Sequence, residues 1–169
     1  MDALTHADGV TPAAGEAALT IAREDPLSPD LDLLFARHHD ACHIDTPPES
    51  IHMLDRSELT APDIAFHVLR DGGRPLGMGA VKTIAPGHGE VKSMHVLAEA
   101  RGRGLSRRLL DHLVDQARGD GLVRLSLETG VQPSFTAARG LYERAGFVEC
   151  PPFGDYAPDP NSLFMTREI

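Results

Sequence analysis

The 169-residue sequence has no tryptophan, only two tyrosines and only two cysteines. Cys42 and Cys150 have no C-x-x-C or other metal-ligand spacing, which argues against a disulfide framework and a cysteine metal site. No apolar run approaches the ~20 residues that cross a bilayer, and residues 1–17 lack the basic stretch and apolar core of a signal peptide. These absences predict a cytoplasmic protein that does not associate with a membrane.

A surplus of positive charge is also missing, because the formal net charge is −9. That balance argues against nonspecific binding to nucleic acid. Hydrophobic residues make up 41% of the chain and charged residues 24%, which is ordinary for a globular protein. We expect residues 1–17, rich in small and polar side chains, to form a mobile tail, and residues 18–169 to form a single domain.

Apolar periodicity divides that domain into strands and helices. Alternating and short apolar runs predict strands over 19–23, 64–69, 76–83, 88–96, 122–127, 147–149 and 163–166. Helical spacing and capping signals predict helices over 31–41, 49–54, 105–117 and 136–145. The pattern predicts an α/β fold in which helices cover a mixed, mostly antiparallel sheet.

The most informative motif is Arg101-Gly102-Arg103-Gly104-Leu105-Ser106, which follows a predicted strand and opens a predicted helix. Free backbone N–H groups and the helix dipole at such a point favour a phosphate or pyrophosphate. No Walker string is present, and Arg107 stands where a dinucleotide fingerprint needs glycine. The motif is similar to the acetyl-CoA loop R/Q-x-x-G-x-G/A, with Ser106 in its last place. A plain strand-to-helix turn is the alternative.

A second motif, Leu141-Tyr142-Glu143-Arg144-Ala145-Gly146-Phe147, follows about forty residues later. Together with the order of elements, the two motifs resemble the GNAT superfamily of N-acetyltransferases over roughly residues 18–169. Strings such as Pro47–His52 and Asp159–Thr166 resemble a small bacterial subgroup known loosely as indole-3-acetate (auxin) acetyltransferases. The resemblance implies one GNAT domain, whose twisted sheet has splayed central strands and flanking helices. It does not imply the acceptor, because a carboxylate is not a sensible acetyl acceptor and the indole nitrogen is barely nucleophilic.

The resemblance also implies acetyl-CoA as co-substrate and no metal. The expected cofactor-binding residues come from the strand end, the phosphate loop and the start of the last helix: Met94, His95, Val96, Arg101, Gly102, Arg103, Gly104, Leu105, Ser106 and Ser134. Within this set, the backbone N–H of Val96 is the candidate to hold the thioester carbonyl. Phe135 stands where many relatives have an asparagine that touches the cofactor, so either Ser134 compensates or this contact is absent.

Two residues are expected to carry catalysis. Tyr142 occupies the position from which the family protonates the departing CoA thiolate; an ordinary half-buried helix tyrosine is the alternative. Glu90 precedes Arg101 by eleven residues, the spacing of the general base in histone-type relatives, although it is equally readable as a strand glutamate beside Lys92. His88 and His95 are rival bases because imidazole titrates near neutrality.

The acceptor pocket is expected to be lined by His38, Glu49, His52, Phe153, Tyr156 and Asn161. His39 and His43, spaced four residues apart, lack the H-E-x-x-H pattern of a zinc site. The Pro-rich segment 151–160 is too punctuated for regular structure, and its aromatic and amide side chains suit a substrate wall.

These observations predict an acetyl-CoA-dependent N-acetyltransferase that acts on a small free amine by direct transfer in a ternary complex. Acylation of a protein amino group is one alternative, and a non-catalytic acyl-CoA-binding module that regulates a partner is another. Tyr142 and Glu90 favour the enzyme. The sequence does not determine the oligomeric state; a homodimer is compatible with it, and dimers are common among such relatives.

Overall fold

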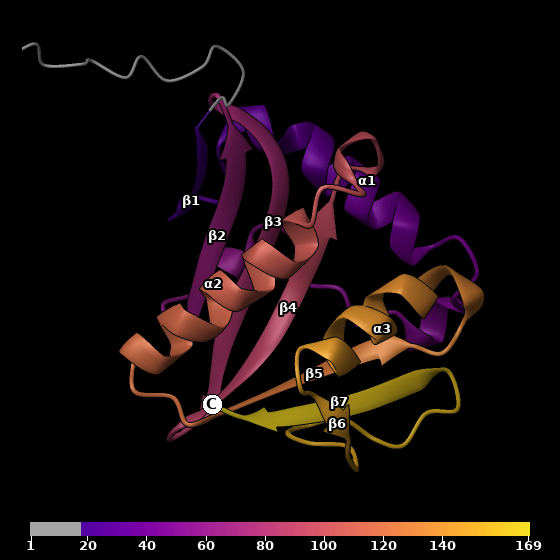
Figure 1. Ribbon diagram of the computed structural model, residues 1–169. Helices are drawn as coiled ribbons and strands as arrows, with labels where there is room; N and C mark the ends of the chain where they lie inside the picture. Colours follow the sequence, from indigo (N-terminus) through magenta and orange to yellow (C-terminus); the bar gives the residue numbers. More distant parts are fainter. Residues whose placement is uncertain (1–17) are drawn as a thin grey trace, which may run out of the picture.

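The computed structural model describes residues 18–169, so the predicted tail at 1–17 lies outside the described residues. Seven strands form one sheet in the order β1-β2-β3-β4-β5-β7-β6 (Figure 1). Only β4 and β5 pair in parallel. The strands are β1 Leu19–Arg23, β2 Ile64–Asp71, β3 Arg74–Ala85, β4 His88–Val96, β5 Arg124–Gly130, β6 Val148–Glu149 and β7 Ser162–Glu168. The prediction of a mixed, mostly antiparallel sheet is confirmed.

Three α-helices accompany the sheet within the described residues: α1 Asp32–Cys42, α2 Leu105–Gly119 and α3 Thr136–Arg144. The apolar stripe of α2, which includes Leu109 and Leu113, is fully buried where the helix crosses β3 and β4 (Figure 1). Leu34 of α1 is buried in the same core as Phe66 of β2. No helix within residues 18–169 is long and apolar enough to span a membrane.

The two central strands separate part-way along their length. β4 and β5 pair only from His88↔Arg124 to Glu90↔Ser126. Beyond Glu90, β4 stays with β3 while β5 pairs with β7, so the two strands diverge (Figure 1). Backbone groups on the facing edges are therefore left without strand partners, and the gap positions the site described below.

A bulge in β4 lies inside this gap. Ser93 has a φ of 55°, and the register with β3 shifts between Met78↔His95 and Ala80↔Lys92. Opposite the bulge stands Gly79, where an added Cβ would lie 2.8 Å from Met94 Sδ and 2.8 Å from a Leu113 methyl. Gly79 therefore lets Met94 pack against α2, and the bulge re-aims the residues that follow it.

One predicted element is wrong. Residues 49–54 do not form a helix: a single 3₁₀ turn at Pro48–Ser50 is followed by extended backbone at Ile51. Leu54 is partly buried and packs against the core cluster that contains Phe66. The segment becomes a wall of the site rather than a helix.

Candidate active site

The phosphate loop has the geometry that its sequence predicts. Gly102 and Gly104 adopt positive φ values of 78° and 71°, and α2 begins directly after Gly104. No side chain caps that helix end, so the first N–H groups of α2 remain available to a ligand. An added Cβ on either glycine would meet nothing within 4 Å, which shows that the loop faces open space.

A cleft of about 370 Å³ runs from this loop to α3. Among the expected cofactor-binding residues, all except Arg103 line it. The Arg103 side chain turns away to an ion pair with Asp71, 2.7 Å between Nη2 and Oδ2; the participation of its backbone N–H stays a prediction. Ser134 lines the cleft while its hydroxyl is held by Asp45 at 2.5 Å.

The end of β4 presents its backbone to the cleft. The Leu97 N–H donates to Leu76 O at 2.9 Å, toward β3. Because N–H directions alternate along a strand, the Val96 N–H points the opposite way, into the gap between β4 and β5. The Val96 carbonyl, on the same side, accepts from Arg101 Nε at 3.3 Å. Val96 therefore offers a backbone donor inside the cleft.

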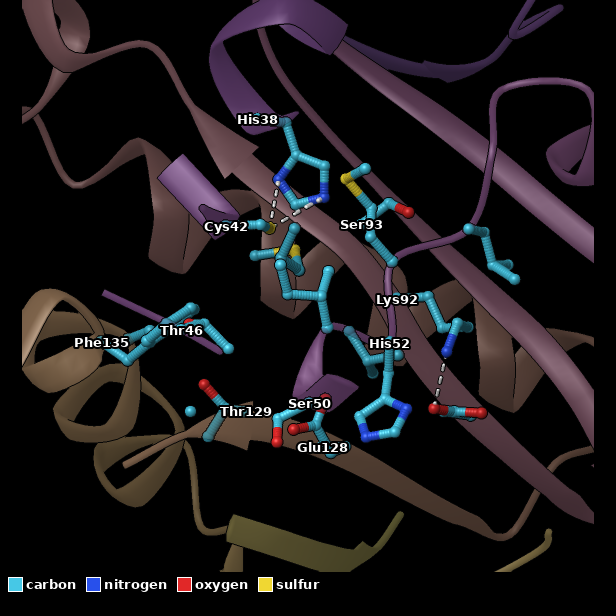
Figure 2. Close-up of a pocket in the computed structure, with 18 of the residues that line it drawn as sticks. His38, Cys42, Thr46, Ser50, His52, Lys92, Ser93, Glu128, Thr129 and Phe135 are labelled. Atoms are coloured by element: carbon cyan, nitrogen blue, oxygen red, sulfur yellow. Dashed lines mark hydrogen bonds and ion pairs between the residues drawn. The ribbon is translucent and has the colours of Figure 1, made fainter. Parts of the chain in front are cut away.

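A second, smaller pocket of about 130 Å³ adjoins the cleft (Figure 2). The two share Met94, Ala138 and Tyr142 as lining residues. Its wall comes from α1, the segment 46–54, β4, β5, Phe135, α3 and Tyr156. In Figure 2, His38 and Cys42 lie at one end, and Ser50, His52 and Glu128 lie at the other.

Tyr142 stands at the junction. Its side chain on α3 is buried, with 7% of the residue exposed, and its ring packs edge-on against Phe147 at 5.9 Å between centroids. Burial, reinforced by the nearby Glu128 carboxylate, raises the pKa of the phenol. The hydroxyl therefore keeps its proton at neutral pH, as a proton donor requires.

Glu90 is also buried, at 5% exposure, and lines the second pocket. Its Oε1 accepts from Tyr156 Oη at 2.5 Å and from Lys92 Nζ at 3.0 Å. Burial and the Glu90 carboxylate raise the pKa of Tyr156, so the phenol donates in this contact. The three groups tie the C-terminal segment to β4.

Three histidines near the site, His38, His88 and His95, have lowered pKa values and are neutral at pH 7. Burial lowers the pKa of His38 and of His95 to about 4, and their rings lie 5.5 Å apart. His88 does not line either pocket; its Nε2 lies 2.7 Å from Ser126 Oγ, and burial lowers its pKa as well. His88 thus lies outside both cavities, whereas His95 lines the cleft.

The predicted acceptor residues divide into two groups. His38, His52 and Tyr156 line the small pocket. Glu49, Phe153 and Asn161 do not, and here the structure corrects the prediction: Glu49 is exposed on the 3₁₀ turn. Phe153 packs on Tyr156 at 5.2 Å between ring centroids, and Asn161 donates to Ser50 Oγ at 3.2 Å. Phe153 and Asn161 therefore contact residues of the pocket wall without lining the pocket themselves.

Glu128 is an ionisable pocket residue that the sequence analysis did not predict. It lies on β5, where burial raises the pKa of its carboxyl and the nearby His52 and Lys92 oppose that rise. The alternation at 123–128 places it on a strand, but nothing in the sequence shows that β4 and β5 diverge beside it. Thr46 Oγ1 is another missed group: it is buried at the wall and has no hydrogen-bond partner among the described residues.

Comparison with known proteins decides the family. The model of the acetyltransferase (GNAT) family matches residues 29–147. The chain belongs to the GNAT family. It is an N-acetyltransferase, and the family uses acyl-CoA.

Several relatives resemble this GNAT chain over most of their length. The uncharacterized N-acetyltransferase YsnE of Bacillus subtilis is 43% identical over 136 residues, which is 80% of this chain and 90% of YsnE. An IAA acetyltransferase of Azospirillum brasilense is 43% identical over 152 residues, 89% of this chain and 98% of the relative. A crystal structure of a Klebsiella pneumoniae protein superposes with a TM-score of 0.71 at 28% identity, covering 90% of this chain and 98% of that one.

Proposed function

We propose that this GNAT protein transfers the acetyl group of acetyl-CoA to the amine of a small molecule, directly and within a ternary complex. The junction of the cleft beside the glycine loop with the small pocket, at Tyr142 and Met94, carries the proposal. Acetyl-CoA supplies the activated thioester. The open glycine loop and the free N–H groups of α2 fit its pyrophosphate.

Direct transfer is supported by the state of the pocket thiol. Cys42 lines the pocket, but burial raises its pKa to about 11. A thiol in that state is a poor nucleophile at neutral pH. Cys150 lines neither the cleft nor the small pocket. The amine itself is then the group that attacks.

Three groups take named roles in this proposal. The Val96 N–H donates to the thioester carbonyl oxygen, where negative charge develops. Tyr142 gives its proton to the departing thiolate. Glu90 accepts the amine proton, directly or through a water, from its position on the pocket wall. Its link to Lys92 and Tyr156 keeps the carboxylate fixed in place.

The size and enclosure of the pocket favour a small molecule over a protein acceptor. The space of about 130 Å³ is walled by the segment 46–54 and by Tyr156, which Phe153 and Phe164 support. A protein amino group would have to enter past both walls.

A thiol-release screen with acetyl-CoA tests the proposal. The acceptors are amino acids, polyamines and amine antibiotics, and mass spectrometry identifies the acetylated product. We expect at least one amine to accelerate CoA release above the hydrolysis background, with intersecting initial-velocity lines. CoA binding without amine-dependent release would indicate the regulatory module instead, and parallel lines would indicate an acyl-enzyme.

A further inference from the structure

The formal charges of the acidic and basic side chains that line the small pocket do not sum to zero. Glu90, Lys92 and Glu128 line it, and Glu90 with Lys92 forms a buried ion pair of 3.0 Å. Among residues 18–169, Glu128 forms no ion pair of its own. His38 is neutral at pH 7 because burial lowers its pKa. Among the Asp, Glu, Lys and Arg side chains of the lining, one carboxylate, that of Glu128, is therefore in excess.

Lys92 is poorly available to bind a negatively charged ligand. Two of its three N–H groups are used, one for Glu90 Oε1 and one for Tyr156 Oη, each at 3.0 Å. The ammonium also lies over the Tyr156 ring, 5.6 Å from the centroid. Drawing Lys92 toward a ligand carboxylate would leave Glu90 buried without its cation, which is a large cost.

Glu128 faces the space where an acceptor would lie. It shares the pocket with Tyr142, and the phenol is close enough for the carboxylate to raise its pKa. Figure 2 shows Glu128 beside Ser50 and His52, on the wall across from Cys42. Thr46 also lines the pocket, and its Oγ1, which has no hydrogen-bond partner among the described residues, can hydrogen-bond a ligand there.

We propose that Glu128 binds a positively charged nitrogen of the acceptor, and that the acceptor class is a small amine with no carboxylate beside the reacting nitrogen. The inference rests on the proposed function and narrows it. An amino acid would bring its carboxylate toward the excess negative charge of Glu128. An amine of the same skeleton would replace that repulsion with an attraction in a site that excludes much water.

Matched pairs of acceptors test this class directly. Tyramine with tyrosine, histamine with histidine and cadaverine with lysine differ only by the carboxylate. We expect the amine of the accepted pair to exceed its amino acid at least ~10-fold in kcat/KM, since one close charge contact contributes about 1.4 kcal/mol or more. Glu128→Gln should raise the KM of the amine and leave the KM of the amino acid nearly unchanged. The ratio of kcat/KM for the amine to kcat/KM for the amino acid should therefore fall. Glu149→Gln, an exposed glutamate on β6, is the matched control and should keep it.

Different failures separate the two proposals. Equal or better use of the amino acids, or an unchanged ratio in Glu128→Gln, would overturn the acceptor class and leave the N-acetyltransferase proposal standing. Absence of turnover with every acceptor would overturn the proposed function. In that case calorimetry of the same pairs on the CoA-saturated protein still decides the inference: preferential amine binding that Glu128→Gln abolishes supports it, and equal or no binding overturns it.

Discussion

The two halves of the site are built differently. The cofactor cleft depends largely on one stretch of chain, from Met94 to Arg107, which runs from a strand end through a glycine loop into a helix. The acceptor pocket draws its wall from α1, the segment 46–54, β4, β5, α3 and Tyr156. A site formed by one continuous segment can be recognised in the sequence as a motif. A site formed by several separate segments cannot, because its geometry depends on how the strands diverge.

Tyr142 lines both halves and carries the acidic proton among the residues that they share, so its removal should have the largest effect. Tyr142→Phe is expected to lower kcat by ~10²–10⁴-fold. The affinity for acetyl-CoA should change little, because the hydroxyl acts on charge that forms only as the thiolate leaves. Steady-state kinetics together with CoA calorimetry make the comparison. Equal turnover by the two proteins would reduce Tyr142 to a packing residue.

Lys92→Met should disturb the acceptor half and spare the cofactor half. The change leaves Glu90 buried without its cation, and we expect a loss of about 3–5 kcal/mol in the free energy of unfolding. Denaturant titration measures it. Lys92→Met with Glu90→Gln removes both charges and should recover most of the loss. A single variant as stable as wild type would show that the pair does not hold this wall.

Gly104→Glu tests the cofactor half alone. A carboxylate at the open loop repels the pyrophosphate, and losing one charged hydrogen bond costs roughly 1.5–3 kcal/mol of CoA binding. Gly104→Ala is the control: it shares the left-handed strain of 71° but adds no charge. CoA calorimetry should show a much larger loss for Glu than for Ala. Equal affinities would remove the loop from the CoA site.

The smallest effect concerns pH. The pKa of His38 and of His95 is about 4 in the folded protein, below the unfolded value of about 6.5. The unfolded chain therefore binds more protons as the pH falls below 6.5, and stability should be full above 6.5 and decline toward pH 4. His38→Gln should make that decline shallower in thermal denaturation, whereas His39→Gln, at an exposed position, should not.

The same contrast explains what the sequence could predict. The strands along the chain and the glycine loop before α2 follow from local periodicity and spacing, and Tyr142 follows from its motif; the loop glycines and Tyr142 line the cleft. Glu128 was not predicted as a pocket residue because the strand pattern of β5 does not show that β4 diverges from it. The helix predicted at 49–54 failed because Leu54 packs into the core, a long-range contact that overrides local preference. Asn161 and Phe153 were expected in the pocket, yet they support it from behind.

A crystal structure with acetyl-CoA bound tests the account most directly. We expect the pyrophosphate on the first N–H groups of α2, and the thioester carbonyl within hydrogen-bond distance of the Val96 N–H. The acetyl group should then point past Tyr142 into the pocket that holds Glu90 and Glu128. Acetyl-CoA bound elsewhere, or an acetyl group directed away from that pocket into solvent, would contradict the claim that the two cavities form one active site.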